Sequence, residues 1–286
     1  MNRTIRTDLA LEAEALWREA QPSDASPAGV RARREKRGSF AVTTVEVLDA
    51  RGEAALGKPR GTYVTVELDA LIRREENAFP EACGLLSDTL RSLLPLAPAD
   101  ACLVVGLGNR AITPDAVGPD AVDCVMVTRH LTQQLPEEFG EFRPVSAVCS
   151  GVLGTTGIES SALVRAVAET VKPAAVVAID ALAALEPARL CRSVQITDAG
   201  IVPGSGVGNA RSALNRETLG VPVVAVGVPT VVDAAALCGR QDVGGMFVTP
   251  RDIDARVREA ARLVGYALDL AFHEGLEIGD VEALLS

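Results

Sequence analysis

Two aspartates follow apolar segments at positions where they could perform acid–base chemistry. Asp115 lies in a loop after the run CLVVGL, which begins at Cys102, and Asp180 comes directly after AAVVAI. An aspartate that directly follows a fully apolar strand is costly to bury unless it faces water, a partner or a metal. Ligands and reacting groups gather at the carboxyl ends of parallel strands, so both acids are expected to converge there.

A pair of aspartates held close together can hydrolyse a bond without a histidine. Two neighbouring carboxylates cannot both ionise easily, so the pKa of one rises and the pair shares a proton. One acid can then activate a water molecule while the other protonates a leaving amine. For Asp115 a structural role, as the N-cap of the helix after Thr-Pro, remains an alternative.

The other motifs give weaker indications of chemistry. The sequence GLGNRA from Gly106 resembles a dinucleotide fingerprint, but a proline and Asp115 delay the helix and put negative charge where a phosphate would lie. Neither histidine, His130 or His273, falls on a strand-end loop, and no His or Cys spacing indicates a metal site. We therefore expect no metal and no cofactor, although a divalent metal stays open.

A glycine-rich loop, PGSGVGN, follows the segment QITDAG. Its glycines are Gly204, Gly206 and Gly208. Backbone amides exposed by such a loop could bind the main chain of a substrate or an oxyanion, so these three residues are candidate substrate-binding positions. A plain tight loop is the alternative interpretation.

The order of the expected elements predicts an α/β fold. From residue 102 strands and helices alternate, which is typical of a helix-flanked, mostly parallel sheet. The expected strands are 102–107, 144–149, 174–179, 193–197 and 221–227, and the expected helices are 119–133, 158–171, 181–188, 230–238 and 251–273. Before them, strands at 40–48 and 62–68 predict a β-rich extension, and residues 70–94 are expected to be helical with a break at Pro80.

The N-terminal region has its own pattern. Apolar residues at helical spacing predict a helix over 9–20, with Thr7 and Asp8 as candidate caps. The basic run RARREKRG after it is expected to be a solvated loop, and residues 50–61 are expected to be a connection between strands.

Composition and charge limit the classes of function. The 286 residues carry a formal net charge of −10, which argues against nucleic acid as the main partner. There is no apolar signal-like segment at the N-terminus and no run of membrane-spanning length, so a cytoplasmic protein without a membrane partner is expected. The six scattered cysteines are expected to be reduced and mostly buried.

Long blocks of the sequence resemble the germination protease family of spore-forming bacteria, which is related in fold to the hydrogenase maturation endopeptidases. The similar blocks, in order, are IRTDLALEAE, GKPRGTYVTVE, CLVVGLGNRAITPDAVGP, TRHL, FRPVSAV, GVLGTTGIE, AIDALAA, QITDAGIVPGSGVGNARSALNRETLGVPVVAVGVPTVVDA and FVTPRDID. Together they cover nearly the entire chain, so the resemblance is more specific than any single motif.

The resemblance implies an endopeptidase that begins the degradation of small acid-soluble spore proteins during germination. It implies a self-processing zymogen, a homotetramer, and a location in the cytoplasm of the forespore and spore core. The catalytic aspartates of the family fall on Asp115 and Asp180. The processing point falls between Asp8 and Leu9, so residues 1–8 are expected to be a propeptide and 9–286 a single peptidase domain.

The sequence also departs from that family. Family members carry a long insertion where this chain has only ALCGRQDVGGMF, around residues 236–246. The lack of this insertion bears on substrate gating and on oligomeric contacts. The maturation endopeptidases use two acids and a histidine for metal, and no histidine here matches the third ligand, so a metal-free acid pair is favoured. A peptidyl-tRNA hydrolase, which shares VGLGN, and a non-catalytic α/β binding module remain the alternatives.

Overall fold

The computed structural model describes residues 7–21, 26–205 and 212–285, which form a helix-flanked sheet. The strands are β1 (Val30–Arg37), β2 (Phe40–Val47), β3 (Gly61–Glu67), β4 (Cys102–Leu107), β5 (Val145–Gly151), β6 (Ala175–Ala184), β7 (Ser193–Thr197), β8 (Val223–Asp233) and β9 (Phe247–Val248). The longer helices are α1 (Ala10–Glu19), α2 (Ala50–Leu56), α4 (Ala78–Leu93), α5 (Val117–Val122), α6 (Arg129–Gln134), α9 (Ser160–Val171), α11 (Ala234–Cys238), α12 (Ile253–Phe272) and α13 (Ile278–Leu285). The single-turn helices are α3 (Asp69–Ile72), α7 (Pro136–Phe139), α8 (Leu153–Thr156), α10 (Arg216–Leu219), η1 (Thr113–Asp115), η2 (Pro187–Arg189) and η3 (Gln241–Val243).

The sheet has a parallel core and antiparallel flanks. Its strand order in the described residues is β1-β2-β3-β7-β8-β6-β4-β5, with β9 added to β8. Strands β8, β6, β4 and β5 are parallel, whereas β1, β2, β3 and β7 pair antiparallel. The predicted α/β class and the N-terminal β-rich extension are therefore confirmed.

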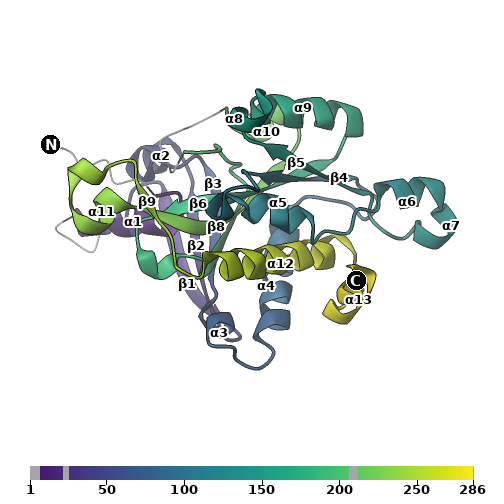
Figure 1. Ribbon diagram of the computed structural model, residues 1–286, viewed down its shortest axis with the longest axis horizontal. Helices are drawn as coiled ribbons and strands as arrows, with labels where there is room; N and C mark the ends of the chain where they lie inside the picture. The colour runs from purple at the N-terminus through teal and green to yellow at the C-terminus, as the bar shows by residue number, and fades with distance from the viewer. Residues whose placement is uncertain (1–6, 22–25, 206–211, 286) are drawn as a thin grey trace.

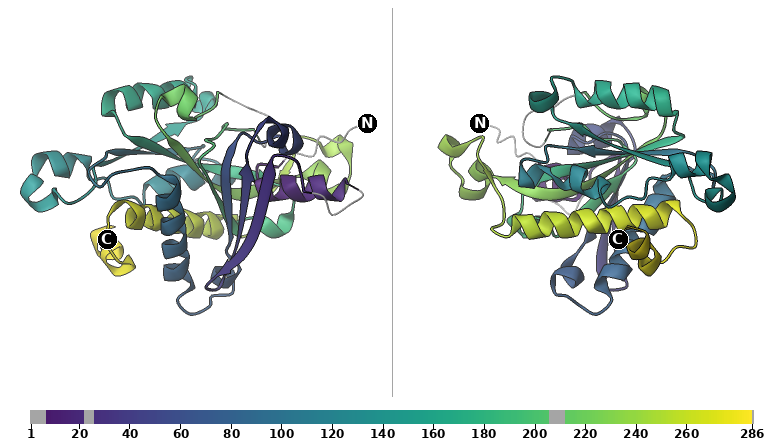
Figure 2. Two further views of the ribbon diagram at one scale, coloured as in Figure 1. Left: turned by 180° about the vertical axis from the view of Figure 1, so that it is seen from behind. Right: turned by 45° about the vertical axis from the view of Figure 1, so that its right-hand side comes forward.

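Helices cover both faces of the sheet, as Figure 1 and the two views of Figure 2 show. Helices α4, α5 and α12 pack on one face, where Val104, Val177 and Ile179 belong to the largest apolar cluster. On the other face, α9 packs over β4 and β5, and α1 packs over β2. Because side chains alternate along a strand, the odd residues of β6 up to Ile179 face α12, while Val176, Ala178 and Leu182 face α1 and α9.

Two expectations about local structure were wrong. Residues 181–184 continue β6 rather than starting a helix, because β8 also continues and pairs with them as far as Val232. The basic run is the edge strand β1, which pairs along its whole length with β2. The expected connection at 50–61 is present and contains α2, whose N-terminus is capped by the carboxylate of Asp49. In addition, the helix expected over 119–133 is divided into α5 and α6.

No described helix is both long enough and apolar enough to cross a membrane. Helix α12, the longest, instead buries one apolar side against α4 and α5. Its buried side also contains the acid Asp269, whose Oδ1 accepts a hydrogen bond of 2.9 Å from the Met126 N–H. Burial raises the pKa of Asp269 to about 8.

Replacing Asp269 with asparagine is expected to make the stability less dependent on pH. The folded protein keeps a proton on Asp269 between about pH 4 and pH 8, where the unfolded chain has released it, so the free energy of unfolding falls as pH rises. This contribution reaches about 1.4 kcal/mol per pH unit. Asparagine does not titrate, and its carbonyl can still accept from Met126. Urea unfolding of both proteins at several pH values measures how the free energy of unfolding depends on pH. The same dependence in both proteins would contradict the prediction.

Candidate active site

The first aspartate is held by a tight turn after β4. The chain leaves β4, passes Asn109 and reaches η1, and the Asn109 N–H donates 2.8 Å to Oδ2 of Asp115. Gly108 has φ +114°, and a Cβ there would lie 2.1 Å from the Asp115 carbonyl oxygen. Only glycine combines this backbone conformation with so close an approach. The N-cap alternative for Asp115 is not what the structure has, because helix α5 follows with Ala116 as its N-cap.

The second aspartate lies within β6, at the residue where its neighbour β4 no longer pairs with it. The last paired residues of β4 and β6 before this point are Gly106 and Ile179. Asp180 is almost fully buried, and its Oδ1 accepts 2.9 Å from the Ala181 N–H. The strand was expected to end before Asp180, but β6 continues to Ala184.

The charge of Asp115 acts on Asp180. Burial raises the pKa of Asp180 well above its usual value, and the negative charge of Asp115 raises it further. The charge of Asp8 acts in the same direction. Burial also raises the pKa of Asp115, while the Asn109 N–H opposes this shift. Of the two acids, Asp180 therefore holds a proton more readily.

Both aspartates line one cleft of about 1120 Å³. Its walls come from α1, the α2–β3 connection, η1, strands β6, β7 and β8, and the segment 199–205. The N-terminal residues Thr7 and Asp8 also line it, so the expected processing point lies in the same cleft as the acid pair. The cleft is large enough to hold a peptide segment.

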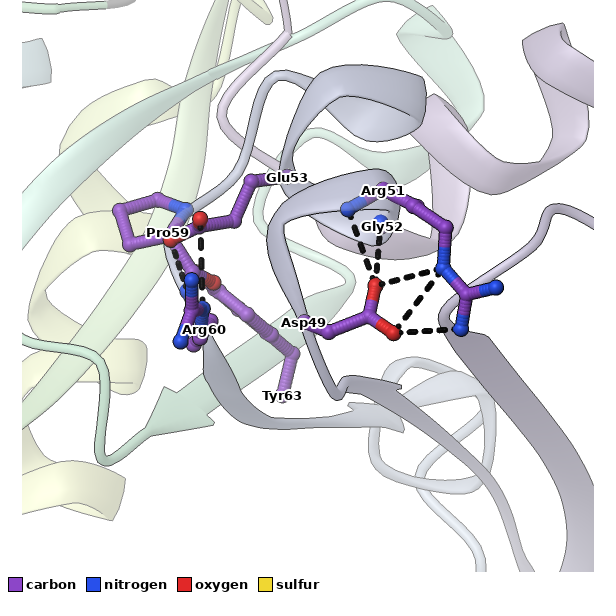
Figure 3. A network of polar contacts seen from close by, with 7 residues as sticks. All are labelled: Asp49, Arg51, Gly52, Glu53, Pro59, Arg60 and Tyr63. Carbon is purple, nitrogen blue, oxygen red and sulfur yellow. Dashed lines mark hydrogen bonds and ion pairs between the residues drawn. The ribbon is translucent and has the colours of Figure 1, made fainter.

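The rim of this cleft is braced at the α2–β3 connection, which Figure 3 shows from close by. The Tyr63 hydroxyl donates 2.8 Å to the Pro59 carbonyl, and the Glu53 carboxylate accepts from both the main chain and the guanidinium of Arg60. These contacts fix the neighbouring Lys58, whose ammonium donates 2.8 Å to the Thr7 carbonyl. Burial lowers the pKa of Lys58, and the charges of Asp8 and Glu12 oppose this shift.

Asp8 is not a helix cap, contrary to expectation, because the N-cap of α1 is Leu9. Its carboxylate instead accepts from the Ala183 N–H and from the Ser205 hydroxyl, both at 2.8 Å. Its own N–H donates 2.9 Å to the Ala183 carbonyl. The N-terminal segment thus lies beside the part of β6 that β4 leaves unpaired.

The candidate residues of the glycine-rich loop are only partly within the described chain. Gly204 lines the cleft, next to the Ser205 that contacts Asp8. Gly206 and Gly208 lie outside the described residues. Sequence reasoning missed Gln195 and Lys58 as cleft residues. The signal for Gln195 was available, since it is a polar residue in the middle of the buried strand SVQIT.

Among residues 7–21, 26–205 and 212–285, no three His, Cys, Asp or Glu side chains form a group that could hold a metal ion. His130 lies on α6, and His273 follows α12, where its ring packs against Phe142. The residues therefore do not fit a site made of two acids and a histidine.

Comparisons with known proteins agree on one family. A family model described as germination protease matches residues 8–241. The germination protease of Caldanaerobacter subterraneus subsp. tengcongensis is 38% identical over 322 aligned positions, which cover 98% of each chain. That of Clostridium tetani is 36% identical and covers 99% of this chain and all of its own. That of Priestia megaterium is 44% identical over 82% of this chain and 65% of its own.

A hydrogenase maturation protease of known structure is also similar. It is the [NiFe] hydrogenase maturation protease HycI of Thermococcus kodakarensis, with a TM-score of 0.39 and 18% sequence identity. The match covers 63% of this chain and 98% of that one.

Proposed function

Because this chain belongs to the germination protease family, we propose that it is an endopeptidase in which Asp115 and Asp180 activate water. The observation that carries the proposal is that both carboxylates line one cleft, close enough that the charge of Asp115 raises the pKa of Asp180. Perturbed acids that face each other in a cleft are typical of catalytic sites.

The two acids take different parts in the proposed reaction. Asp180 is the more deeply buried, and its pKa is raised by both burial and its neighbour, so it holds the shared proton. Asp115 has the main-chain N–H of Asn109 to stabilise its negative charge, so it is the ionised base. The titration belongs to the pair as a whole.

The proposed reaction adds one water molecule to a peptide bond. Asp115 removes a proton from water, and the water oxygen attacks the carbonyl carbon to form a tetrahedral intermediate. The carbon–nitrogen bond then breaks as Asp180 donates its proton to the leaving nitrogen. The products are a carboxylic acid and an amine, and the proton taken up by Asp115 returns the pair to its starting state. The proposed reaction contains no step through a metal, because the described residues do not form the required donor set.

The proposal includes the biological setting that the sequence resemblance implies. The substrates are small acid-soluble spore proteins, the location is the cytoplasm of the forespore and spore core, and the chain is made as a zymogen. In support of self-processing, Asp8 already lies in the same cleft as the acid pair. Residues 1–8 are the proposed propeptide, and cleavage between Asp8 and Leu9 releases it.

The proposed assembly is a homotetramer. The segment around residues 236–246, which the sequence resemblance implies is short compared with the family, exposes apolar side chains of α11, of β9 and of the residue before β9. These are Leu237, Met246, Phe247 and Val248. Subunit contacts that cover this patch would remove apolar surface from water. Sedimentation velocity on the purified protein measures the assembly, and a monomer at micromolar concentration would contradict it.

Self-processing gives the most direct test of the proposed function. Purified full-length chain is expected to lose residues 1–8 on incubation, so that its intact mass corresponds to a chain beginning at Leu9. The processed protein is expected to cleave a peptide that contains Thr-Glu-Phe-Ala, which keeps the order acid, apolar residue, alanine found at Asp8–Ala10. Mass spectrometry identifies both products. A chain that still begins at Met1 and leaves the peptide intact would contradict the proposal and favour a non-catalytic module.

A chelator separates the two possible forms of the mechanism. The acid pair alone predicts that EDTA leaves both reactions unchanged. If EDTA stopped cleavage and added divalent metal restored it, the metal-free mechanism would be wrong and the peptidase function would stand.

A further inference from the structure

One buried side chain contacts the main chain on both sides of the Asp8–Leu9 peptide bond. Nε2 of Gln195 donates a hydrogen bond of 3.2 Å to the Asp8 carbonyl oxygen. Oε1 of the same side chain accepts 2.8 Å from the Ala10 N–H. The amide group therefore binds only main-chain atoms, and it spans the bond that self-processing would break.

Gln195 and Asp180 lie in one row across the sheet. Gln195 of β7 pairs with Gly227 of β8, and Gly227 pairs with Asp180 of β6. Paired residues of neighbouring strands point to the same face, so both side chains project toward the face that α1 covers. Two strand spacings separate them, which is roughly 10 Å between backbones. The side chain of Leu182 covers Gly227 between them. Asp180, Leu182 and Gln195 all line the same cleft.

The rest of the N-terminal segment is held by other groups. Ala183 binds the Asp8 main chain, Ser205 binds its carboxylate, and Lys58 binds the Thr7 carbonyl. Among the hydrogen bonds of the described residues, the one from Gln195 is the bond that reaches the Asp8 carbonyl oxygen. This oxygen becomes negatively charged when water attacks the carbonyl carbon.

We propose that Gln195 is a catalytic residue that binds the substrate main chain and stabilises the oxyanion of the tetrahedral intermediate. This inference rests on the proposed peptidase function. As water adds to the Asp8 carbonyl carbon, the electron pair of the C=O double bond moves to oxygen, and the Nε2–H bond to that oxygen strengthens. When the carbon–nitrogen bond breaks, the pair returns and the carbonyl re-forms. Gln195 neither gains nor loses a proton.

A purely structural role for Gln195 predicts different behaviour. Ala10 is the first residue of α1, so its N–H has no partner within the helix, and Oε1 of Gln195 satisfies it. In that case only the acceptor atom would matter. The proposed role instead depends on the donor, Nε2. The two roles can therefore be separated by a side chain that keeps the acceptor and removes the donor.

The experiment compares Gln195→Glu and Gln195→Met with the wild type in the full-length chain. The measured quantity is the first-order rate constant for conversion to the form beginning at Leu9, followed by intact mass across a range of pH. Glutamate keeps an acceptor for the Ala10 N–H, and it donates only when protonated. Methionine removes both functions at nearly constant volume. Ser193→Ala is the matched control, because Ser193 lies two residues along β7, is equally buried and does not line the cleft.

Near neutral pH, the rate constant of Gln195→Glu is expected to be about 10²- to 10³-fold lower than that of the wild type, which is the usual effect of removing one oxyanion donor. The ratio of wild-type to Gln195→Glu rate constants should fall as pH falls and the glutamate protonates. Gln195→Met should be slow at every pH, and Ser193→Ala should match the wild type. Thermal unfolding of each variant reports whether it folds, and a folded Gln195→Glu suffices even if Gln195→Met is lost.

Two outcomes would overturn the proposal in different ways. If Gln195→Glu processes as fast as the wild type at all pH values, Gln195 is only an anchor for α1, and the peptidase function stands. If the wild type itself never loses residues 1–8, self-processing and this role of Gln195 both fail. A chain expressed to begin at Leu9 then shows, by its activity on the Thr-Glu-Phe-Ala peptide, whether peptidase activity survives on its own.

Discussion

Replacing Asp180 with asparagine is expected to reduce the rate of peptide-bond cleavage by about 10²- to 10⁴-fold, the usual contribution of one general acid or base. Asparagine has nearly the same shape and cannot deliver a proton to the leaving nitrogen. Asp115→Asn should show a loss of similar size, because it removes the base. The double variant should be little worse than either single variant, since the two residues act as a unit.

The pH dependence of cleavage provides a second measurement on the same variants. The active form holds one proton on the pair, so the rate should fall at low pH, where both acids are protonated, and at high pH, where both are ionised. Because burial and the charge of Asp115 raise the pKa of Asp180 well above its usual value, the active form persists to higher pH than two ordinary aspartates would allow. In Asp180→Asn the decline on the alkaline side should disappear from the residual rate.

A third aspartate provides the control for this pair. Asp120 lies on α5, five residues after Asp115; burial raises its pKa too, but it does not line the cleft and it forms an ion pair with Arg110. Asp120→Asn should therefore keep wild-type activity. Full activity in Asp115→Asn or Asp180→Asn would end the acid-pair mechanism.

The positions of the two acids could be predicted because local sequence determines them. Each follows an apolar run with the composition of a buried strand, and such strands in one parallel sheet end at a common edge. The continuation of β6 could not be predicted in this way. The segment ALAAL has the composition of a helix, yet β8 pairs with it as far as Ala184, and the N-terminal segment binds its other side at Ala183. Both partners are distant in sequence, and tertiary contacts override local propensity.

Strand β1 was missed for a related reason. Its sequence, VRARREKR, has no apolar alternation, because it is an edge strand with one hydrogen-bonded neighbour and mostly exposed side chains. Charged residues are common on such edges, where they discourage pairing with other chains. The contacts of Gln195 with residues 8 and 10 also bridge more than 180 positions of sequence, so they follow from the packing of α1 on the sheet.

Gly118→Ala is expected to impair the site although the residue contacts no substrate. A Cβ at Gly118 would lie 2.3 Å from the Leu107 carbonyl oxygen and 2.5 Å from the Ile179 carbonyl oxygen. These atoms belong to β4 and β6, next to Gly108 and Asp180, and they are backbone atoms that cannot rotate away. Helix α5 must therefore move away from the sheet by up to about an ångström to reach an ordinary contact distance.

That movement would act mainly on the distance between the two acids. Asp115 is three residues before Gly118 and moves with the start of α5, whereas Asp180 stays with β6. A misplacement of about 1 Å costs roughly 10²-fold in rate, and overpacking lowers the free energy of unfolding by about 1–3 kcal/mol. Gly84→Ala is the matched control. Gly84 lies in the interior of α4, and a Cβ added there would have no atom of another element within 4 Å, so the substitution should leave the free energy of unfolding unchanged or raise it slightly. The measurement is the cleavage rate of both variants at a temperature well below their unfolding midpoints. If Gly118→Ala were as active as Gly84→Ala, the acids would tolerate this displacement and the prediction would be wrong.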